Sequence, residues 1–230
     1  MVVSRFSGVC PEMSSQLLDG LAPADRKTVL EAAATRRFPA NSVIANQGRP
    51  ADHLYLLTKG RARNVLVTED GKKLLLIWLG PGDMFGVQAL LSSRRSYLIS
   101  TEMTKDSSVL EWDRTTIRGL AARYPRLLEN ALSIASDFVA WYITTHIALT
   151  SYTARQRLAQ VLVCLAQAIG ERVPGGIELD VTNEDLARAA NITTFTVCRL
   201  MSEWRRTSGV MKLRGKVVLR SPEELLVNLA

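Results

Sequence analysis

The 230-residue sequence predicts an α+β protein with a strand-rich N-terminal part, a long helix and a C-terminal module of helices and a hairpin. Short apolar segments alternate with glycine turns over residues 36–113, which is typical of an antiparallel β-roll or jelly roll. Residues 126–169 contain neither glycine nor proline and carry apolar side chains at helical spacing. Residues 182–220 have the pattern of two helices, a tight turn between them and a following hairpin.

The N-terminal part, residues 1–125, is expected to begin with a helical lead-in over residues 14–34. A helix over residues 114–122 should follow the strands, and Pro125 should end it. Glycines between the apolar segments supply the turns. The expected strands are residues 42–44, 53–58, 62–67, 73–79, 96–99 and 108–112.

The long helix, residues 126–152, carries an apolar stripe with alternating spacings of four and three residues, as in a coiled coil. A second face is also apolar, with Ile134, Phe138 and Trp141, so one face can serve the barrel and the other a second copy of the chain. The same pattern also fits a single helix packed on its own barrel. A hinge is expected at residues 151–153. The stripe consists of Leu128, Leu132, Ala135, Val139, Tyr142, His146 and Leu149.

The C-terminal module, residues 153–230, has the pattern of a winged helix-turn-helix. Thr182 is expected to cap the first helix through the amide near Asp185. Asn191 lies at the turn, where a positive φ is needed, and Thr193 can cap the second helix. The residues expected to pack the two helices together are Leu186, Ala187, Val197, Leu200 and Trp204.

The charge of this module predicts duplex DNA as the partner. Between Thr193 and Arg220, seven basic residues and one acid, Glu203, leave a net charge of +6, nearly the whole +7 of the chain. A basic patch confined to one region favours phosphate, although a solvated basic face on a three-helix core has the same composition. A recognition helix reads bases near its N-terminus. The expected DNA-binding residues are Thr193, Thr194, Phe195, Thr196, Arg199, Arg205, Arg206, Lys212, Arg214 and Lys216.

Composition argues against several other classes of protein. No apolar run approaches the ~20 residues that cross a bilayer, and the N-terminus lacks a secretory apolar segment, so we expect a cytoplasmic protein without membrane contact. Cys10, Cys164 and Cys198 form no disulfide framework and no C-x-x-C pair. His53 and His146 lie too far apart in sequence to favour a structural zinc site. Without a Ser/His/Asp set, a P-loop or paired carboxylates, we expect no enzyme.

Four segments, in their order along the chain, resemble the CRP/FNR superfamily of bacterial transcription regulators. They are residues 48–60, residues 80–86, Arg95–Ser96 and residues 193–199. The resemblance covers nearly the whole chain and implies a cyclic-nucleotide-binding-like sensor domain, a dimerisation helix and a winged helix-turn-helix. It also implies a homodimer whose two recognition helices enter successive major grooves of double-stranded DNA. An activator would need a surface patch for RNA polymerase, and the sequence identifies none.

The resemblance also bears on the effector. In cyclic-nucleotide-binding members, a segment like residues 85–96 holds the cyclic phosphate through helix amides, an arginine and a serine. Gly86, Arg95 and Ser96 match this pattern. Val87 replaces the family's ribose-binding glutamate, and an unpaired sugar hydroxyl costs about 1–3 kcal/mol. The other expected effector-binding residues are Gln88, a substitute acceptor, and Tyr142 and Thr145, where the long helix of the family meets the purine.

The sequence leaves three effector hypotheses open: a cyclic nucleotide, another small anionic ligand, and activity without a ligand. Iron–sulfur sensing of the FNR type needs four cysteine ligands, and the chain has three cysteines. Haem would need His53 or His146, and both fit structural roles better. Oxidation of Cys198 would repel DNA phosphate, but a small residue packed at the DNA face is the simpler interpretation.

Base recognition should differ from the family pattern. The forked guanidinium of Arg199 matches O6 and N7 of guanine. The family has a glutamate four residues earlier, where this chain has Phe195, which makes only apolar contacts such as one with a thymine methyl. The usual family operator is therefore not the expected target. The rival class is a cyclic-nucleotide-responsive signalling module whose C-terminal domain binds protein rather than DNA.

Overall fold

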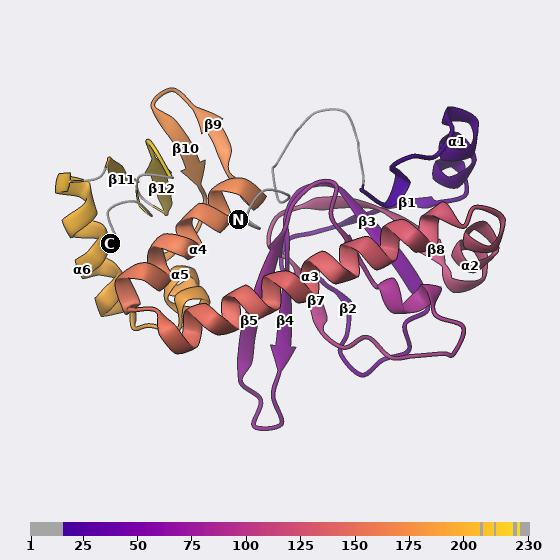
Figure 1. The fold of residues 1–230 in the computed structure, drawn as a ribbon, viewed down its shortest axis with the longest axis horizontal. Helices are drawn as coiled ribbons and strands as arrows, with labels where there is room; N and C mark the ends of the chain where they lie inside the picture. The colour runs from indigo at the N-terminus through magenta and orange to yellow at the C-terminus, as the bar shows by residue number, and fades with distance from the viewer. Residues whose placement is uncertain (1–15, 208, 214, 223–224, 226–230) are drawn as a thin grey trace. The chain divides into compact units, whose positions relative to one another are not determined.

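The structure is a computed structural model that describes residues 16–207, 209–213, 215–222 and 225. The chain divides into two compact units, and their boundary falls between Ala140 and Trp141, within one helix. Figure 1 shows the strand-rich N-terminal unit and the C-terminal unit with its helices and hairpins.

The N-terminal unit is built from two antiparallel four-stranded sheets (Figure 1). The first has the order β1-β8-β3-β6, with β1 at Ala34–Phe38, β8 at Ser107–Asp113, β3 at His53–Lys59 and β6 at Met84–Phe85. The second has the order β2-β7-β4-β5, with β2 at Val43–Ala45, β7 at Ser100–Met103, β4 at Ala62–Val67 and β5 at Lys73–Leu79. The predicted β-roll is confirmed.

A first apolar core fills the space between these sheets, because both contribute buried side chains to it. Its larger members are Tyr55, Leu57, Leu79, Phe85 and Met103. The rings of Tyr55 and Phe85 stack with centroids 4.8 Å apart. This packing holds β6 firmly just before the segment expected to bind an effector.

A second core joins the helices to the first sheet. The short helices η1 (Gln16–Leu18) and η2 (Val87–Leu90), and the α-helices α1 (Pro23–Glu31) and α2 (Arg114–Arg123), pack around the fully buried Trp112. The indole Nε1 of Trp112 donates a hydrogen bond to the carbonyl of Val29 at 2.8 Å. A strand and a helix distant in sequence are thereby joined.

Two of the predicted elements of this unit are wrong in position. The strand expected at residues 96–99 is instead β7 at Ser100–Met103, and Ser96 forms only an isolated bridge with Pro50. The hydroxyl of Tyr97 exchanges hydrogen bonds with the backbone of His53, at 3.0 and 3.2 Å, and holds the segment as a loop. The expected lead-in helix ends at Glu31, and β1 follows; residues 14–15 lie outside the described part of the chain.

The long helix α3 spans Arg126–Ser151, close to its predicted range. Its first half packs on the second core through Leu127, Ala131 and Ile134. The amide of Asn130 donates hydrogen bonds of 2.8 Å to the carbonyls of Leu17 and Asp19. The predicted stripe lies on the outside: five of its seven members are exposed large hydrophobic residues, namely Leu128, Leu132, Val139, Tyr142 and Leu149.

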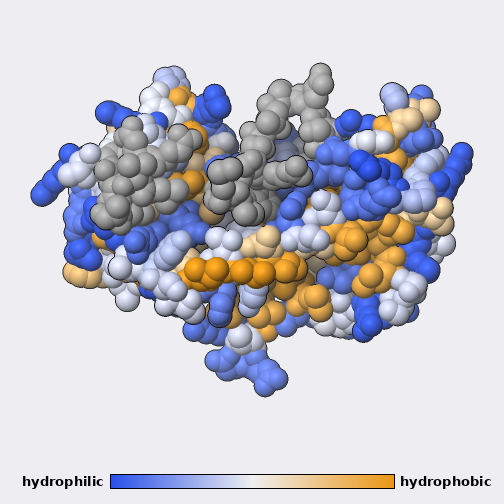
Figure 2. All heavy atoms as spheres, in the orientation of Figure 1, coloured by the Kyte–Doolittle hydropathy of each residue, from blue (hydrophilic) through white to orange (hydrophobic). Residues whose placement is uncertain are grey.

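Helix α3 is also long and apolar enough, by length and composition alone, to cross a membrane. The prediction from the sequence considered only unbroken apolar runs, which residues such as Ser136, Asp137 and His146 interrupt. Because the helix is apolar on average, the prediction missed it as a candidate span. Figure 2 shows apolar surface gathered in a band along this helix. By itself, one such helix is weak evidence for a membrane span.

The C-terminal unit surrounds a separate core. Helix α4 (Ala154–Ile169) packs on α5 (Asn183–Ala190) and α6 (Thr194–Thr207). A four-stranded sheet of order β11-β12-β10-β9 completes it, with β9 at Glu171–Val173, β10 at Gly176–Leu179, β11 at Val210–Leu213 and β12 at Lys216–Leu219. The predicted winged helix-turn-helix is confirmed, whereas the β9–β10 hairpin was not predicted.

Candidate DNA interface and effector site

The helix-turn-helix is capped as the sequence predicts. The Thr182 hydroxyl accepts from the Asp185 amide at 3.1 Å, and the Asp185 carboxylate accepts from the Thr182 amide at 3.1 Å. Asn191 ends α5 in the left-handed conformation, with φ 50° and ψ 54°. The Thr193 hydroxyl accepts from the Thr196 amide at 3.1 Å. Local hydrogen bonds thus define where both helices begin and how the chain turns between them.

Helix α6 has one buried face and one exposed face. Val197, Leu200 and Trp204 are buried in the core, as predicted. Phe195 is 78% exposed, which is the largest exposure among the described large hydrophobic residues. The other exposed residues near the start of this helix are Thr194, Cys198 and Arg199, while Thr196 is half-buried. The first two turns therefore present a mixed apolar and cationic surface.

Arg199, the expected base reader, is held by a carboxylate. Its Nη1 donates to Oε1 of Glu203, one turn later on α6, at 2.7 Å. The second oxygen of Glu203 accepts from Nη1 of Arg155, on α4, at 2.8 Å. In the sequence Glu203 was considered only as an acid that reduces the local charge, although its spacing of four residues from Arg199 was a signal for this pair.

Another arginine, Arg157, joins α4 to the turn between α5 and α6. Its Nε donates to the carbonyl of Ala190 at 2.9 Å, and its Nη2 to the carbonyl of Asn191 at 3.3 Å. Its Nη1 donates to the carbonyl of Tyr152 at 3.0 Å. Sequence reasoning missed this residue because the carbonyls of Ala190 and Asn191 lie far from it in the chain.

The basic residues expected on the DNA backbone differ in their surroundings. Arg205 and Arg206 are exposed in the last turn of α6. Nζ of Lys216 on β12 lies 2.5 Å from Oε1 of Glu178 on β10, and this carboxylate holds the pKa of the lysine above its usual value. Lys212 lies on β11, and Arg214 falls outside the described residues.

In the sensor unit, Gly86 marks the start of the candidate effector site. Its φ of 82° is left-handed, and a Cβ at this position would lie 2.5 Å from the carbonyl oxygen of His53. Helix η2 follows directly, with Gln88 half-buried and Val87 packed against the second core. Only glycine fits this strand-to-helix turn without strain.

Arg95 and Ser96 lie on an exposed loop after η2. The Nε of Arg95 donates to the hydroxyl of Ser93 at 3.2 Å, and both predicted residues are exposed. Tyr142 and Thr145 belong to the part of α3 beyond Ala140, and they are exposed and half-buried, respectively.

Two neighbouring arginines anchor this loop, and sequence reasoning missed both of them. Arg114 donates from Nη1 to the carbonyl of Ala89 at 2.8 Å and from Nη2 to the carbonyl of Ser92 at 2.9 Å. Arg94 donates from Nη2 to both carboxylate oxygens of Asp52, at 2.9 and 2.8 Å. The chain just before Arg95 is thus held by charged side chains.

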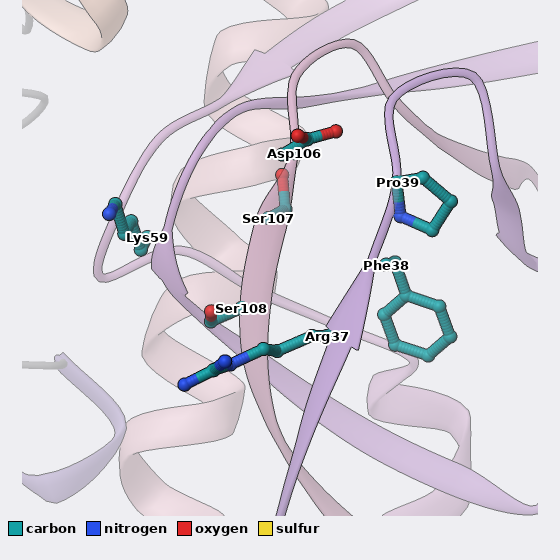
Figure 3. A pocket seen from close by; sticks show the side chains of 7 residues that line it. All are labelled: Arg37, Phe38, Pro39, Lys59, Asp106, Ser107 and Ser108. Atoms are coloured by element: carbon teal, nitrogen blue, oxygen red, sulfur yellow. The ribbon is translucent and has the colours of Figure 1, made fainter.

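Two surface hollows lie in the sensor unit, and neither is lined by a predicted effector residue. Figure 3 shows the larger one, of about 540 Å³, where Arg37 and Ser108 are register partners on β1 and β8. The smaller one, of about 370 Å³, is lined by Asp52, Arg94 and Arg114 among others. Within the described part of the chain, no group of three His, Cys, Asp or Glu residues could hold a metal ion.

Comparison with known proteins agrees with this architecture. Residues 35–124 match the family model of the cyclic nucleotide-binding domain, and residues 156–227 match that of the Crp-like helix-turn-helix domain. The CRP-like cAMP-activated global transcriptional regulator of Mycobacterium tuberculosis is 27% identical over 227 residues, which cover 98% of this chain and 95% of the relative.

Solved structures share the fold. FixK2 from Bradyrhizobium japonicum superposes with a TM-score of 0.73 at 22% identity, covering 86% of this chain and 96% of FixK2. The c-di-GMP responsive global regulator CLP of Xanthomonas campestris gives a TM-score of 0.72 at 18% identity, covering 87% of this chain and 100% of CLP.

The fold and these matches define a DNA-binding transcription regulator with a cyclic-nucleotide-binding-like sensor domain. The chain belongs to the CRP/FNR superfamily, whose members bind DNA and act as dimers. The alternative of a signalling module with a protein-binding C-terminal domain is not favoured, because the helix-turn-helix model matches most of that domain.

Proposed function

We propose that the protein reads a specific operator as a homodimer and that Arg199 makes the main base contact. In this proposal residues 1–125 form the sensor domain, residues 126–152 the dimerisation helix, and residues 153–230 the DNA-binding domain. The observation that carries it is the exposed N-terminal face of α6, backed by the buried Val197, Leu200 and Trp204. A guanidinium on a rigid helix can meet O6 and N7 of guanine together.

The test begins with selection of preferred sites from a random duplex pool by the wild-type protein. Arg199→Ala should then lose roughly tenfold or more of its preference at one base pair of each half-site. Thr193, Thr194, Phe195 and Thr196 are proposed to contact neighbouring bases or phosphates. Unchanged discrimination between the selected site and random DNA in Arg199→Ala would refute the base-reading assignment.

The remaining basic residues are proposed to bind the phosphate backbone without reading sequence. Each phosphate contact contributes roughly 0.9 to the slope of log affinity against log salt. Arg205→Ala or Arg206→Ala should therefore reduce the magnitude of this slope by roughly 0.9 for each subunit, the share of one phosphate contact. The preferred sequence should stay the same. Lys212, Arg214 and Lys216 of the wing belong to the same proposed set.

The homodimer is proposed to form through the exposed stripe of α3. Leu132 is 69% exposed, and Val139 and Tyr142 are each 57% exposed. Contact of these apolar side chains with water is unfavourable, and packing against a second copy of the helix would remove that contact. The double variant Leu132→Asp/Val139→Asp should be monomeric by light scattering, while Ser133→Asp, at an exposed position away from the stripe on the same helix, should stay dimeric. Binding of the wild-type protein to lipid vesicles would instead support a membrane role for α3.

The effector is proposed to be a small anion held at the loop after η2. Arg95 and Ser96 are exposed there, and the proposed set includes Gly86 and Gln88, with Tyr142 and Thr145 from α3. The M. tuberculosis relative is cAMP-activated and CLP is c-di-GMP responsive, so this fold accommodates more than one nucleotide. Because Val87 packs in the core and cannot accept from a ribose hydroxyl, the residues fit the phosphate better than the sugar.

Thermal unfolding with millimolar cyclic AMP, cyclic GMP or cyclic di-GMP tests this proposal. A ligand at 100 times its Kd should add about 2.7 kcal/mol of stability. Arg95→Ala should abolish any such shift, and Arg37→Ala, at the hollow of Figure 3, should keep it. A shift that survives Arg95→Ala would place the ligand elsewhere.

We also propose that the protein acts in the cytoplasm, without membrane contact or catalysis, beside RNA polymerase. The support is its kinship with transcription regulators. Transcription in vitro from a promoter that carries the selected site, with purified polymerase, would distinguish activation from repression. No change in transcript level would count against a regulatory role at that promoter.

A further inference from the structure

We infer that Glu203 is a positioning residue that sets base specificity by holding Arg199 in one orientation. This inference rests on the proposed function, because it concerns how Arg199 reads DNA. It assigns a task to an acid that lies within an otherwise basic stretch, where a carboxylate opposes the binding of phosphate.

The geometry is a bridge between two guanidinium groups. Oε1 of Glu203 accepts from Nη1 of Arg199 at 2.7 Å, and Oε2 accepts from Nη1 of Arg155 at 2.8 Å. Both carboxylate oxygens therefore accept hydrogen bonds, one from an arginine of the recognition helix and the other from an arginine of α4. A single exposed pair between residues four apart holds a side chain only weakly, but the second arginine fixes the carboxylate from the opposite side.

The bridge is in turn anchored to the core. The guanidinium carbon of Arg155 lies 5.5 Å from the centroid of the Trp204 ring, a distance at which a cation and an aromatic face attract. Trp204 is only 1% exposed and cannot move without disturbing the core. The buried Trp204 thus restrains Arg155, Arg155 restrains the carboxylate of Glu203, and this carboxylate restrains Arg199.

This order should matter for base reading. An arginine on a helix surface loses side-chain freedom when it binds a base, and prior fixation removes part of that cost. Because Nη1 of Arg199 contacts Glu203, the edge formed by Nε and Nη2 can meet O6 and N7 of guanine. The carboxylate also lowers the local positive charge, which weakens binding to any sequence.

Removal of Glu203 should therefore have two opposite effects. Preference for the base pair read by Arg199 should fall, because the guanidinium becomes free to turn. Affinity for random DNA should rise, because a negative charge is lost from the interface. A merely structural role would lower both quantities together.

The experiment compares full-length variants by selection from a random duplex pool and by titration of random DNA over a range of salt. The variants are Arg199→Ala, Glu203→Ala, Glu203→Gln and Arg155→Ala. Glu184→Gln is the matched control. Glu184 pairs with Arg188, four residues away on α5, so its substitution removes the same charge without affecting a partner of Arg199. Circular dichroism checks that each variant folds, and Glu203→Gln keeps the shape if Glu203→Ala does not fold.

Arg199→Ala should abolish the preference at one base pair. Glu203→Ala should reduce that same preference from roughly tenfold or more to a few-fold and bind random DNA more tightly, with Glu203→Gln between it and the wild type. Arg155→Ala should also reduce this preference, and Glu184→Gln should keep it. If Arg199→Ala loses the preference while Glu203→Ala keeps or strengthens it, the inference alone fails. If Arg199→Ala keeps it, the base-reading assignment fails and the inference falls with it.

Discussion

The guanidinium of Arg157 donates a hydrogen bond to the carbonyl of Ala190 at 2.9 Å and thereby fastens helix α4 to the turn before the recognition helix. The neighbouring carbonyl of Asn191 accepts from the same group at 3.3 Å. These two carbonyls end helix α5, where backbone oxygens lack partners within the helix. One side chain thus supplies donors to the turn and sets the distance between α4 and the DNA-reading element.

Arg157→Ala should lower the free energy of unfolding of the C-terminal unit by about 1–3 kcal/mol, since it leaves these carbonyls without charged donors. Urea denaturation followed by circular dichroism would measure the change. Arg188→Ala serves as the control, because Arg188 forms an exposed ion pair with Glu184, and its loss should change the free energy of unfolding by less than about 1 kcal/mol. Equal losses in the two variants would show that the Arg157 contacts carry no special weight.

Asn191 should tolerate glycine but not alanine. Its φ of 50° and ψ of 54° lie in the left-handed region, where a side chain with a Cβ costs about 1–2 kcal/mol unless it is Asn or Asp. Asn191→Gly should therefore keep the thermal midpoint close to that of the wild type, and Asn191→Ala should lower it by several degrees. Two equally stable variants would mean that the turn can adopt another conformation.

Gly86→Ala should destabilise the sensor unit more than Gly82→Ala does. Both glycines have a left-handed φ, 82° and 97°, so both substitutions carry backbone strain. At Gly86 a Cβ would also lie 2.5 Å from the carbonyl of His53, whereas at Gly82 no atom lies within 4 Å. The difference between the thermal midpoints of the two variants measures the effect of the clash with the His53 carbonyl. Equal midpoints would show that this clash does not destabilise the protein.

Asp83 should make the stability of the sensor unit depend on pH. Burial raises the pKa of this carboxyl from its usual 3.8 to about 6, although the Gly80 amide, which donates to it at 2.8 Å, opposes the shift. Because the folded pKa lies above the unfolded one, the stabilising effect of the proton is complete below about pH 4 and is lost as the pH rises through 6. The folded protein therefore carries a buried charge at pH 8.

Asp83→Asn removes this charge while its amide oxygen can still accept from Gly80. It should raise the free energy of unfolding at pH 8 by about 1–3 kcal/mol, with the gain vanishing near pH 4. Urea titrations at the two pH values would measure it. Asp70→Asn, at an exposed turn where the Thr68 hydroxyl lowers the pKa of Asp70, should stabilise at neither pH. The same gain for Asp83→Asn at both pH values would contradict the assignment.

Local signals explain what could be predicted from the sequence. Thr182, Asn191 and Thr193 act on amides and backbone angles within a few residues, so the helix-turn-helix boundaries follow from the chain itself. The same holds for β3, β4 and β5, whose apolar runs are bounded by glycine turns. The apolar stripe of α3 was visible for the same reason.

Contacts between distant segments explain what could not be predicted. Three arginines, Arg157, Arg114 and Arg155, each donate a hydrogen bond to an acceptor in a remote part of the chain. No spacing in the sequence predicts such pairs. Tyr97 turned an expected strand into a loop because its partner, His53, lies on another strand. The candidate effector residues were identified by resemblance rather than by local pattern.

Each of the two units contains a buried tryptophan, so intrinsic fluorescence can report on each unit separately. Trp112, bonded to the carbonyl of Val29, reports on the sensor unit, and Trp204, beneath Arg155, reports on the DNA-binding unit. Replacing Trp78 and Trp141 with phenylalanine, and then one of the remaining pair, would leave a single emitter in a chosen unit. The red shift of its fluorescence on heating would then reveal in which half of the molecule a bound effector or operator delays melting.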